Sequence, residues 1–437
     1  MNYNSLEIKK KILDLVSDYS KISFSKKNFL QGISEVPVSG KVIGSLELQN
    51  MVEASLDGVL SAGRFNKQFE EKLSNFLQIK FLLTVNSGSS ANLIAFSTLT
   101  SSKLKERAIQ KGDEVISVAA GFPTTINPII QFGAVPVFVD VKIPTYNINE
   151  NLIEAAITNK TKAIMLAHTL GNPFNLKKIK EICDKYNLWL VEDSCDALGS
   201  KFNNQNVGTF GDLATLSFYP AHHITMGEGG AVFTNSKKLE RIAESFRDWG
   251  RDCFCDAGKD NTCKKRFSWQ LGDLPFGYDH KYTYSHLGYN MKITDMQAAC
   301  GLAQLASLDK FISKRKENFN FLYKNLRDLQ EFLILPEAEK NSEPSWFGFS
   351  LSLRKNNKFN RNDLIKYLNN NKIGTRLLFG GNLIKQPYMK NINFKVHGEL
   401  KNTNFIMENT FWVGLYPGLQ KEHLEYTCLK IKNFFKK

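Results

Sequence analysis

Two adjacent histidines, His222 and His223, lie in a glycine-rich turn directly after a short apolar run. The run, residues 214–220, is typical of a buried strand, and the turn at residues 221–230 reads AHHITMGEGG. An imidazole changes its charge near neutral pH, which suits a histidine in such a turn to general-base catalysis. In the alternative interpretation, the histidine only fills space in an inactive protein. The residue types favour proton transfer at His222.

Asp193 ends a second apolar run, residues 188–194, which also predicts a strand. A carboxylate at that depth needs a partner, because burying an unpaired charge costs free energy. The protonated nitrogen of a pyridine ring would serve, and the pairing would keep the ring in the form that accepts electrons. Equally, Asp193 could cap the turn that follows. Both interpretations remain open on these residues alone.

A third candidate site is the stretch NSGSSAN at residues 86–92, between a predicted strand and a predicted helix. Gly88, Ser89 and Ser90 are small enough to let backbone N–H groups and hydroxyls approach an anion, and a helix N-terminus adds to the attraction. The alternative is that Ser89 or Ser90 is an ordinary helix N-cap. The stretch is consistent with a phosphate site but does not by itself demand one.

Four of the seven cysteines are placed for metal chemistry: Cys195, Cys253, Cys255 and Cys263. The first lies two residues after the strand-ending aspartate, and the other three lie in a polar stretch at residues 249–267. Thiols one residue apart are poorly placed to bridge each other by a disulfide, whereas two thiolates in one turn suit a metal centre. The spacing fits neither the ferredoxin nor the zinc-ribbon patterns, and it favours iron–sulfur somewhat over zinc. The alternative is four incidental cysteines, kept reduced in a cytosolic chain.

The elements that must position these residues follow an alternating pattern from about residue 80 to residue 235. Short apolar runs alternate with segments of helical spacing such as residues 89–99 and 175–186. The predicted strands are residues 81–86, 113–120, 135–141, 163–170, 188–194, 214–220 and 230–235. Such a pattern predicts an α/β fold with a mostly parallel central sheet and helices on both faces. Ligands of such sheets bind at the carboxyl ends of the strands, where the candidate residues lie.

The chain is expected to divide into three parts. Residues 1–55 would form an N-terminal helical extension, and residues 56–300 the large cofactor-binding α/β domain that carries the cysteine-rich stretch. Beyond residue 300 the pattern changes to long helices, at residues 301–326, and a few strands, such as residues 346–353. Residues 301–437 are therefore predicted to form a smaller α+β domain.

Charge and hydropathy limit the classes of protein that this chain can belong to. The net charge of the 437 residues is +14, but the lysines are spread along the sequence, so we expect no nucleic-acid binding. Diffuse positive charge would instead attract a diphosphate-bearing substrate. The sequence has no apolar run long enough to span a membrane, and its first residues lack the apolar centre of a signal peptide. We therefore expect a cytoplasmic protein with no membrane association.

Taken together, these motifs resemble those of the sugar aminotransferase family. Besides the stretches above, the resemblance rests on GRFNKQFEEKLSNFL (63–77), GFPTTINPIIQFGAVPVFVDV (121–141) and GYNMKITDMQAA (288–299), and it extends from about residue 36 to the C-terminus. It implies an aspartate-aminotransferase-like fold (fold type I of the pyridoxal-phosphate enzymes) and a pyridoxal-type cofactor. It also implies nucleotide-linked ketosugar substrates and a homodimer with shared active sites.

The resemblance further implies cofactor contacts for residues drawn from these motifs. The cofactor phosphate would be held by Gly88, Ser89, Ser90 and Ser217, and by Asn290 reaching from the neighbouring subunit. Phe122 would stack on the ring, with ordinary core packing as the alternative, and Asp193 would contact the ring nitrogen.

His222 occupies the position where this family has the lysine that binds its cofactor covalently. The resemblance therefore implies pyridoxamine phosphate held without a covalent bond. His222 would remove a proton from the C4′ carbon of its ketimine with the sugar, and the C3 hydroxyl would leave. That is the chemistry of the histidine branch of the family, the sugar 3-dehydrases. Asp196 and Tyr219, in the same cofactor site, also depart from the residues usual in aminotransferases, as a changed reaction predicts.

The cysteine spacing resembles that of one group in this branch, the CDP-4-keto-6-deoxyglucose 3-dehydrases, whose four cysteines hold a 2Fe–2S cluster. It implies an NADH-dependent flavin and iron–sulfur reductase as electron donor, in the synthesis of 3,6-dideoxyhexoses of lipopolysaccharide O-antigens. Residues 373–387 also resemble the CDP-sugar enzymes, and Arg376 within them is a candidate substrate contact or a surface charge. The alternatives are a TDP- or GDP-sugar 3-dehydrase of the same mechanism, a pyridoxal-phosphate-dependent nucleotide-sugar aminotransferase, and a non-enzymatic iron–sulfur sensor.

Overall fold

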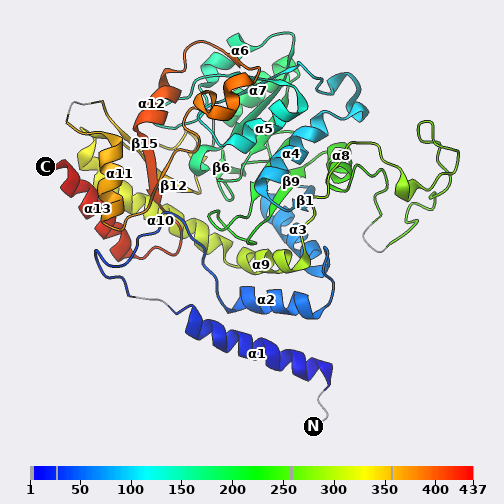
Figure 1. Cartoon of the computed structure of the whole chain (residues 1–437), viewed down its shortest axis with the longest axis horizontal. Coiled ribbons are helices and arrows are strands. Elements are labelled where there is room, and N and C mark those ends of the chain that lie inside the picture. Colours follow the sequence, from blue (N-terminus) through cyan, green and yellow to red (C-terminus); the bar gives the residue numbers. More distant parts are fainter. Residues whose placement is uncertain (1–3, 26–27, 256–258, 356–357, 437) are drawn as a thin grey trace.

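A computed structural model of the chain describes residues 4–25, 28–255, 259–355 and 358–436. Within them, the centre is an eight-stranded sheet (Figure 1). In spatial order its strands are β1 (Phe81–Val85), β9 (Gly230–Thr234), β8 (Leu213–Ser217), β5 (Trp189–Asp193), β4 (Thr161–Ala167), β2 (Glu114–Ser117), β3 (Val135–Phe138) and β14 (Lys395–Val396). Neighbours from β8 to β14 run parallel, whereas β9 runs antiparallel to β1 and β8. The predicted mostly parallel sheet is confirmed.

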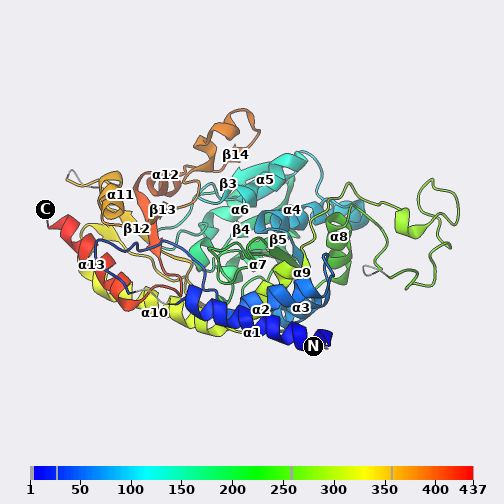
Figure 2. The same ribbon diagram turned by 60° about the horizontal axis from the view of Figure 1, so that its bottom comes forward.

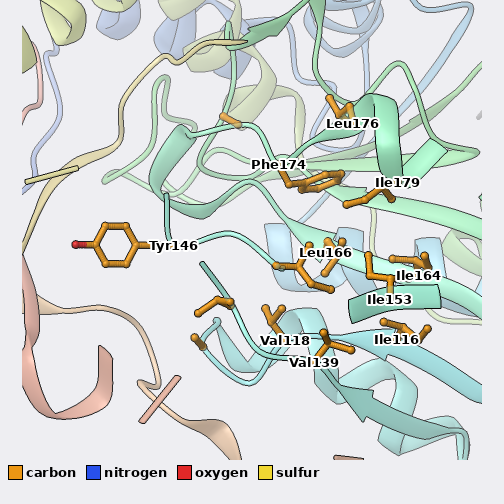
Figure 3. Close-up of a cluster of buried hydrophobic side chains, with 14 of the residues drawn as sticks. Ile116, Val118, Val139, Tyr146, Ile153, Ile164, Leu166, Phe174, Leu176 and Ile179 are labelled. Carbon is orange, nitrogen blue, oxygen red and sulfur yellow. The ribbon is translucent and has the colours of Figure 1, made fainter. Parts of the chain in front are cut away.

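Both faces of this sheet are covered, so alternate residues of a strand enter different cores. In β4, Ile164 packs into the hydrophobic cluster of Figure 3, whereas Met165 packs into a second cluster, and both side chains are fully buried. Burial on both faces explains why the strands appear in the sequence as continuous apolar runs. The helices of this body are α3 (Arg64–Leu77), α4 (Gly88–Leu99), α5 (Pro123–Phe132), α6 (Ile153–Ala156), α7 (Leu176–Tyr186), α8 (Lys237–Arg247) and α9 (Asp295–Leu305).

A second, antiparallel sheet forms the centre of the C-terminal part, as predicted for an α+β arrangement. Its strands are β10 (Leu333–Ile334), β12 (Gly348–Leu353), β15 (Thr410–Gly414) and β13 (Thr375–Leu377), in that order. The helices of this part are α10 (Leu308–Leu326), α11 (Arg361–Asn370), α12 (Lys401–Asn409) and α13 (Lys421–Phe435). A small sheet of β6 (Lys201–Phe202), β7 (Gln205–Asn206) and β11 (Ser342–Glu343) connects the two parts.

Two details of the C-terminal part differ from the pattern of the sequence. The segment 301–326 is divided, because α9 ends at Leu305 and α10 begins at Leu308. The break follows from packing: α9 contacts α2 and α3, whereas α10 contacts α13, so the two apolar faces need different directions. In addition, β14 leaves the C-terminal part and pairs with the edge strand β3 of the large sheet.

The N-terminal residues form two helices, α1 (Ser5–Ser23) and α2 (Ser45–Leu56), which pack against each other along the lower edge of the molecule (Figure 2). A capping box starts α1, since Asn4 accepts a hydrogen bond from the backbone of Glu7 and the Glu7 side chain accepts one from Asn4. Helix α2 in turn packs against α9. Within the described residues, no helix combines the length and the apolar character needed to span a bilayer.

Between α8 and α9 the chain leaves the body as an excursion, residues 249–288, seen in green at the right of Figures 1 and 2. Its described residues contain one short helical turn, η4 (His280–Tyr282). The base of the excursion is closed by pairing: the Ser285 N–H donates to the Gly250 carbonyl over 2.8 Å. A Cβ at Gly250 would lie 1.9 Å from the His286 carbonyl oxygen, so only glycine allows this approach. The two ends of the excursion therefore lie side by side.

Candidate active site

A cavity of roughly 1110 Å³ opens at the carboxyl ends of three adjacent strands. Strands β4, β5 and β8 end there at Ala167, Asp193 and Ser217, as expected for a parallel sheet. One wall comes from the C-terminal part, through β13 and the segments around it. The cavity is lined by ten residues that the sequence predicted for the site: Gly88, Ser89, Phe122, Asp193, Cys195, Asp196, Ser217, Tyr219, His222 and Arg376.

The phosphate-site prediction concerns the start of α4, which faces the cavity next to Ser217. Ser87 caps the helix, and its hydroxyl accepts a hydrogen bond from the Ser90 N–H over 3.0 Å, so the interpretation of Ser89 or Ser90 as the N-cap is wrong. Ser89 is left exposed in the cavity, whereas the hydroxyl of Ser90 is bonded to that of Ser87. The N-terminus of α4, with the hydroxyl groups of Ser89 and Ser217 beside it, suits a phosphate.

Gly88 leaves room at this helix start that no other residue would leave. A Cβ there would lie 2.4 Å from the Cβ of Ser217 and 3.2 Å from the sulfur of Cys195. The close approach of α4 to the end of β8 therefore depends on glycine.

Gly88→Ala is expected to weaken cofactor binding at least tenfold, because the new methyl group must push the start of α4 away from Ser217. We also expect a loss of about 1–3 kcal/mol in the free energy of unfolding, as for other overpacked sites. Spectroscopic titration with pyridoxamine phosphate and urea unfolding measure the two effects. The matched control is Gly44→Ala, where the nearest atom to the added Cβ is 3.6 Å away in the N-terminal helices. Unchanged affinity in the Gly88 variant would contradict the assignment of α4 to the phosphate.

Asp193 is almost fully buried, and donors surround its carboxylate. Oδ2 accepts hydrogen bonds from Asn92 Nδ2 over 2.8 Å and from Thr125 Oγ1 over 2.7 Å. Oδ1 accepts the backbone N–H of Cys195 over 3.2 Å, so the turn-capping interpretation also describes a real contact. These bonds hold the carboxylate at the base of the cavity, where it suits a cationic ring nitrogen. Asn92 and Thr125 were not predicted, although Asn92 closes the stretch NSGSSAN.

Phe122 lies at the N-cap position of α5 and is 50% exposed in the cavity wall. Ordinary core packing is therefore excluded for this ring. Its neighbour is Phe379, whose ring is perpendicular to it at a centroid distance of 6.1 Å. The exposed face suits the stacking of a flat aromatic ligand.

His222 lines the cavity beside Asp196, with Nδ1 3.3 Å from Oδ1 of the carboxylate. The contact is not a regular hydrogen bond, and Nδ1 has no hydrogen-bonded partner among the described residues. Burial raises the pKa of Asp196, and His222 opposes the rise. A carboxylate behind a histidine orients the ring and stabilises its protonated form, which suits a general base. The ring also packs against Phe347, at 5.1 Å between centroids.

The second histidine, His223, is turned away from the cavity and buried. Its Nε2 lies 2.7 Å from the Ser345 carbonyl oxygen, to which it must donate. Burial lowers the pKa of His223 well below the usual value, with the charge of Arg315 adding to the effect, so the ring is neutral. His223 is therefore a structural neighbour of the candidate base.

The remaining predicted contacts are placed differently. Tyr219, 52% exposed, and Arg376 of β13 line the cavity, so Arg376 is more than a surface charge. Asn290 lies outside the cavity of its own chain, just beyond the base of the excursion, where its backbone pairs with that of Asp248. Phe347, which reaches the cavity from the C-terminal part, was not predicted from the sequence.

The four candidate metal ligands fall into two places. Cys195 lines the main cavity, and burial and Asp193 raise the pKa of its thiol well above the usual value. Cys253, Cys255 and Cys263 border a separate small cavity in the excursion. Within the part of the chain that the structure describes, no three histidine, cysteine or acidic side chains are close enough to form a metal site. A hydrogen bond with Thr262 lowers the pKa of Cys255.

This fold and cavity define a class of proteins. Residues 42–432 match the DegT/DnrJ/EryC1/StrS aminotransferase family, and the chain belongs to this family. The predicted family and its aspartate-aminotransferase-like fold are confirmed, and with them the expectation of an enzyme.

Individual relatives are similar over nearly the whole chain. Lipopolysaccharide biosynthesis protein RfbH of Salmonella typhimurium is 63% identical over 98% of both chains. The dTDP-4-dehydro-2,6-dideoxy-D-glucose 3-dehydratase of Saccharopolyspora spinosa is 49% identical over 99% of this chain and 93% of its own. Among solved structures, the E. coli GDP-4-keto-6-deoxy-D-mannose-3-dehydratase with bound hydrated PLP is 29% identical, with a TM-score of 0.81 over 91% of this chain and 99% of that one.

Proposed function

We propose that this protein is a pyridoxamine-phosphate-dependent 3-dehydratase of a nucleotide-linked 4-keto-6-deoxy sugar. The observation that carries the proposal is the side chain at the reacting end of the cavity. His222 lies there with Asp196 behind it, and no lysine is among the described residues that line the cavity. A bound cofactor would therefore keep a free amine. The names of the relatives, which include three sugar 3-dehydratases, support the same reaction class.

The residues of the cavity fit a pyridoxamine phosphate molecule from end to end. The start of α4, with Ser89 and Ser217, would hold the phosphate, and Asp193 would hold the ring nitrogen in its protonated state. Phe122 offers an exposed ring face for stacking. When bound, the cofactor supplies an amine that condenses with the C4 ketone of the sugar and a ring that accepts electrons.

The chain itself would supply proton transfer and positioning. His222 would take the proton from the C4′ carbon of the cofactor onto its imidazole. It could then give that proton to the departing C3 hydroxyl, because one histidine can serve as base and then as acid. Asp196, 3.3 Å from Nδ1, orients the imidazole of His222 between these steps. Asn92 and Thr125 donate hydrogen bonds to the Asp193 carboxylate and fix it in place. The aromatic wall formed by Phe347, Phe379 and Trp412 limits the access of water to the reacting end.

For the substrate we propose CDP-4-keto-6-deoxy-D-glucose, leading to 3,6-dideoxyhexoses of O-antigens. Support comes from the similarity to a lipopolysaccharide biosynthesis protein over nearly the full length of both chains. Arg376, on the cavity wall formed by the C-terminal part, would meet a phosphate of the nucleotide. The 3-dehydratases named for dTDP- and GDP-sugars keep the corresponding nucleotides as alternatives.

We include a 2Fe–2S cluster in the proposal, with Cys195, Cys253, Cys255 and Cys263 as ligands and an NADH-dependent flavin and iron–sulfur reductase as electron donor. The donor types suit the group, and three of the thiols border one cavity of the excursion, although the described side chains are not close enough to hold a metal as they stand. Cys195 lies in the other cavity, so the excursion must change its conformation to bring all four together. When bound, the cluster would supply one-electron chemistry, with Cys195 as the ligand nearest the main cavity.

A homodimer in the cytoplasm completes the proposal. Asn290 would reach the phosphate in the neighbouring subunit's site, which agrees with its place outside the cavity of its own chain.

Two measurements on the purified protein test the proposed function. Borohydride reduction should leave the cofactor free, because the cavity has no lysine among its described lining residues. Mixing with pyridoxamine phosphate labelled at C4′ and CDP-4-keto-6-deoxyglucose should release the label to water. Cofactor fixed to the chain by borohydride would instead make the protein an ordinary aminotransferase, and a lack of label release with CDP-, dTDP- and GDP-ketosugars alike would reject the dehydratase assignment.

A further inference from the structure

Arg315 of α10 is the largest side chain that is fully buried in the described residues, and it points at the turn that carries His222. Its Nη2 donates to the His222 carbonyl oxygen over 3.2 Å. Its Nη1 donates to two successive carbonyls of the segment before β12, at 3.2 Å to Trp346 and 3.1 Å to Phe347. One guanidinium therefore joins the loop of the candidate base to the C-terminal part.

This arrangement is costly in free energy. Burial lowers the pKa of Arg315 to about 10, so the side chain is still a cation at neutral pH. Its Nε has no hydrogen-bond partner, and no ion pair holds it among the described residues, although the charge of Asp196 is near enough to favour the cation. A buried cation bonded only to carbonyls stabilises a fold poorly compared with apolar packing. The hydrogen bonds of Arg315 to two separate segments therefore indicate a role in positioning them and not in stabilising the fold.

A second contact fixes the same turn to the same segment. His223, next to His222, donates from Nε2 to the Ser345 carbonyl over 2.7 Å. The Ser345 N–H in turn donates to Ser200 Oγ over 2.8 Å. The segment 345–347 is thus bonded to Ser200, which follows β5 of the large sheet, and it is a fixed support for the turn that carries His222 and His223. The ring of Phe347, from this segment, packs directly on the imidazole of His222.

We propose that Arg315 is a positioning residue that sets the place of the His222 imidazole over the reacting atoms. The inference rests on the proposed function in one respect, the role of His222 as the base. Arginine is required because its planar fork reaches carbonyls of two segments at once, whereas a lysine ammonium cannot keep both bonds. A displacement of about 1 Å at a base costs roughly 100-fold in rate.

The test compares Arg315→Lys and Arg315→Met with a matched control on the same helix. Asn318→Leu removes another buried clamp, since Asn318 Nδ2 donates to the Leu415 carbonyl over 3.1 Å, away from the cavity. Label release from C4′ of pyridoxamine phosphate, in a single turnover with CDP-4-keto-6-deoxyglucose, should fall about 10- to 100-fold in both Arg315 variants. The affinity for pyridoxamine phosphate should stay unchanged, and Asn318→Leu should lower the melting temperature without lowering the rate.

A second readout needs no turnover. The protein has seven histidines, and comparison with His222→Asn identifies the imidazole signal of His222 in the NMR spectrum of histidine-labelled protein. The signal should shift in Arg315→Lys and stay in place in Asn318→Leu. An unmoved signal and an unchanged rate in Arg315→Lys would overturn the inference. If the unaltered protein releases no label, the proposed function fails, while the imidazole signal still decides whether Arg315 positions His222.

Discussion

His222→Asn is expected to stop release of the C4′ label while pyridoxamine phosphate remains bound. The proposed cofactor contacts lie elsewhere, at the start of α4, at Asp193 and at Phe122, and the amide can neither take nor return a proton at neutral pH. A general base contributes roughly 100- to 10,000-fold, so the residual rate should approach the background. Single-turnover assays with labelled cofactor, together with a spectroscopic titration, measure both effects.

The matched control for that variant is His397→Asn, which changes a histidine that does not line the cavity. It should behave like the unaltered protein. Full label release by His222→Asn would remove His222 from the reaction, and loss of cofactor binding in this variant would assign it a binding role instead.

Cys253→Ala is expected to remove the iron while sparing the dehydration step. Cys253 borders the cavity of the excursion and takes no part in lining the main cavity, so the cluster and the proton chemistry are separable. Anaerobically purified protein should contain about two irons and two acid-labile sulfides per chain, with a one-electron paramagnetic signal after reduction. The variant should contain neither, lose reductase-dependent turnover completely, and still release the C4′ label.

Two further variants sharpen this experiment. Cys428→Ala, in the buried core of the C-terminal part, should keep its iron. Cys195→Ala should lose the iron and also weaken pyridoxamine phosphate binding, because its sulfur packs near Gly88 in the main cavity. Zinc, or no metal, in the unaltered protein would reject the cluster and leave a dehydratase that does not use single electrons.

The large sheet could be predicted because its strands are visible locally. The run 188–194 corresponds to β5 (Trp189–Asp193) and the run 230–235 to β9 (Gly230–Thr234), since burial on both faces makes most residues of each strand apolar. Asp193 and His222 could be found for a similar reason. Asp193 is a charged residue at the end of strand β5, and His222 lies in the turn that follows strand β8. Local pattern and local position were sufficient for these features.

Other parts of the site depend on contacts between distant segments. Asn92 and Thr125 meet at Asp193 only after α4 and α5 pack against the sheet, and Phe347 reaches the cavity from the other part of the chain. The sequence pattern indicates only a charged residue on a polar helix face at Arg315, although its side chain is fully buried. No spacing along the chain encodes such pairings, because they depend on the direction in which whole elements pack.

Because its base is closed by backbone pairing, the excursion can be separated from the rest of the protein. Its ends meet where the Ser285 N–H bonds to the Gly250 carbonyl, so a short turn could replace everything between them without moving α8 or α9. Shortening a surface loop also lowers the entropic cost of closing it. A chain with such a turn in place of the excursion should keep the large sheet and the residues that line the main cavity. The excursion thus has its own boundary in the chain, separate from the strands whose carboxyl ends form the main cavity.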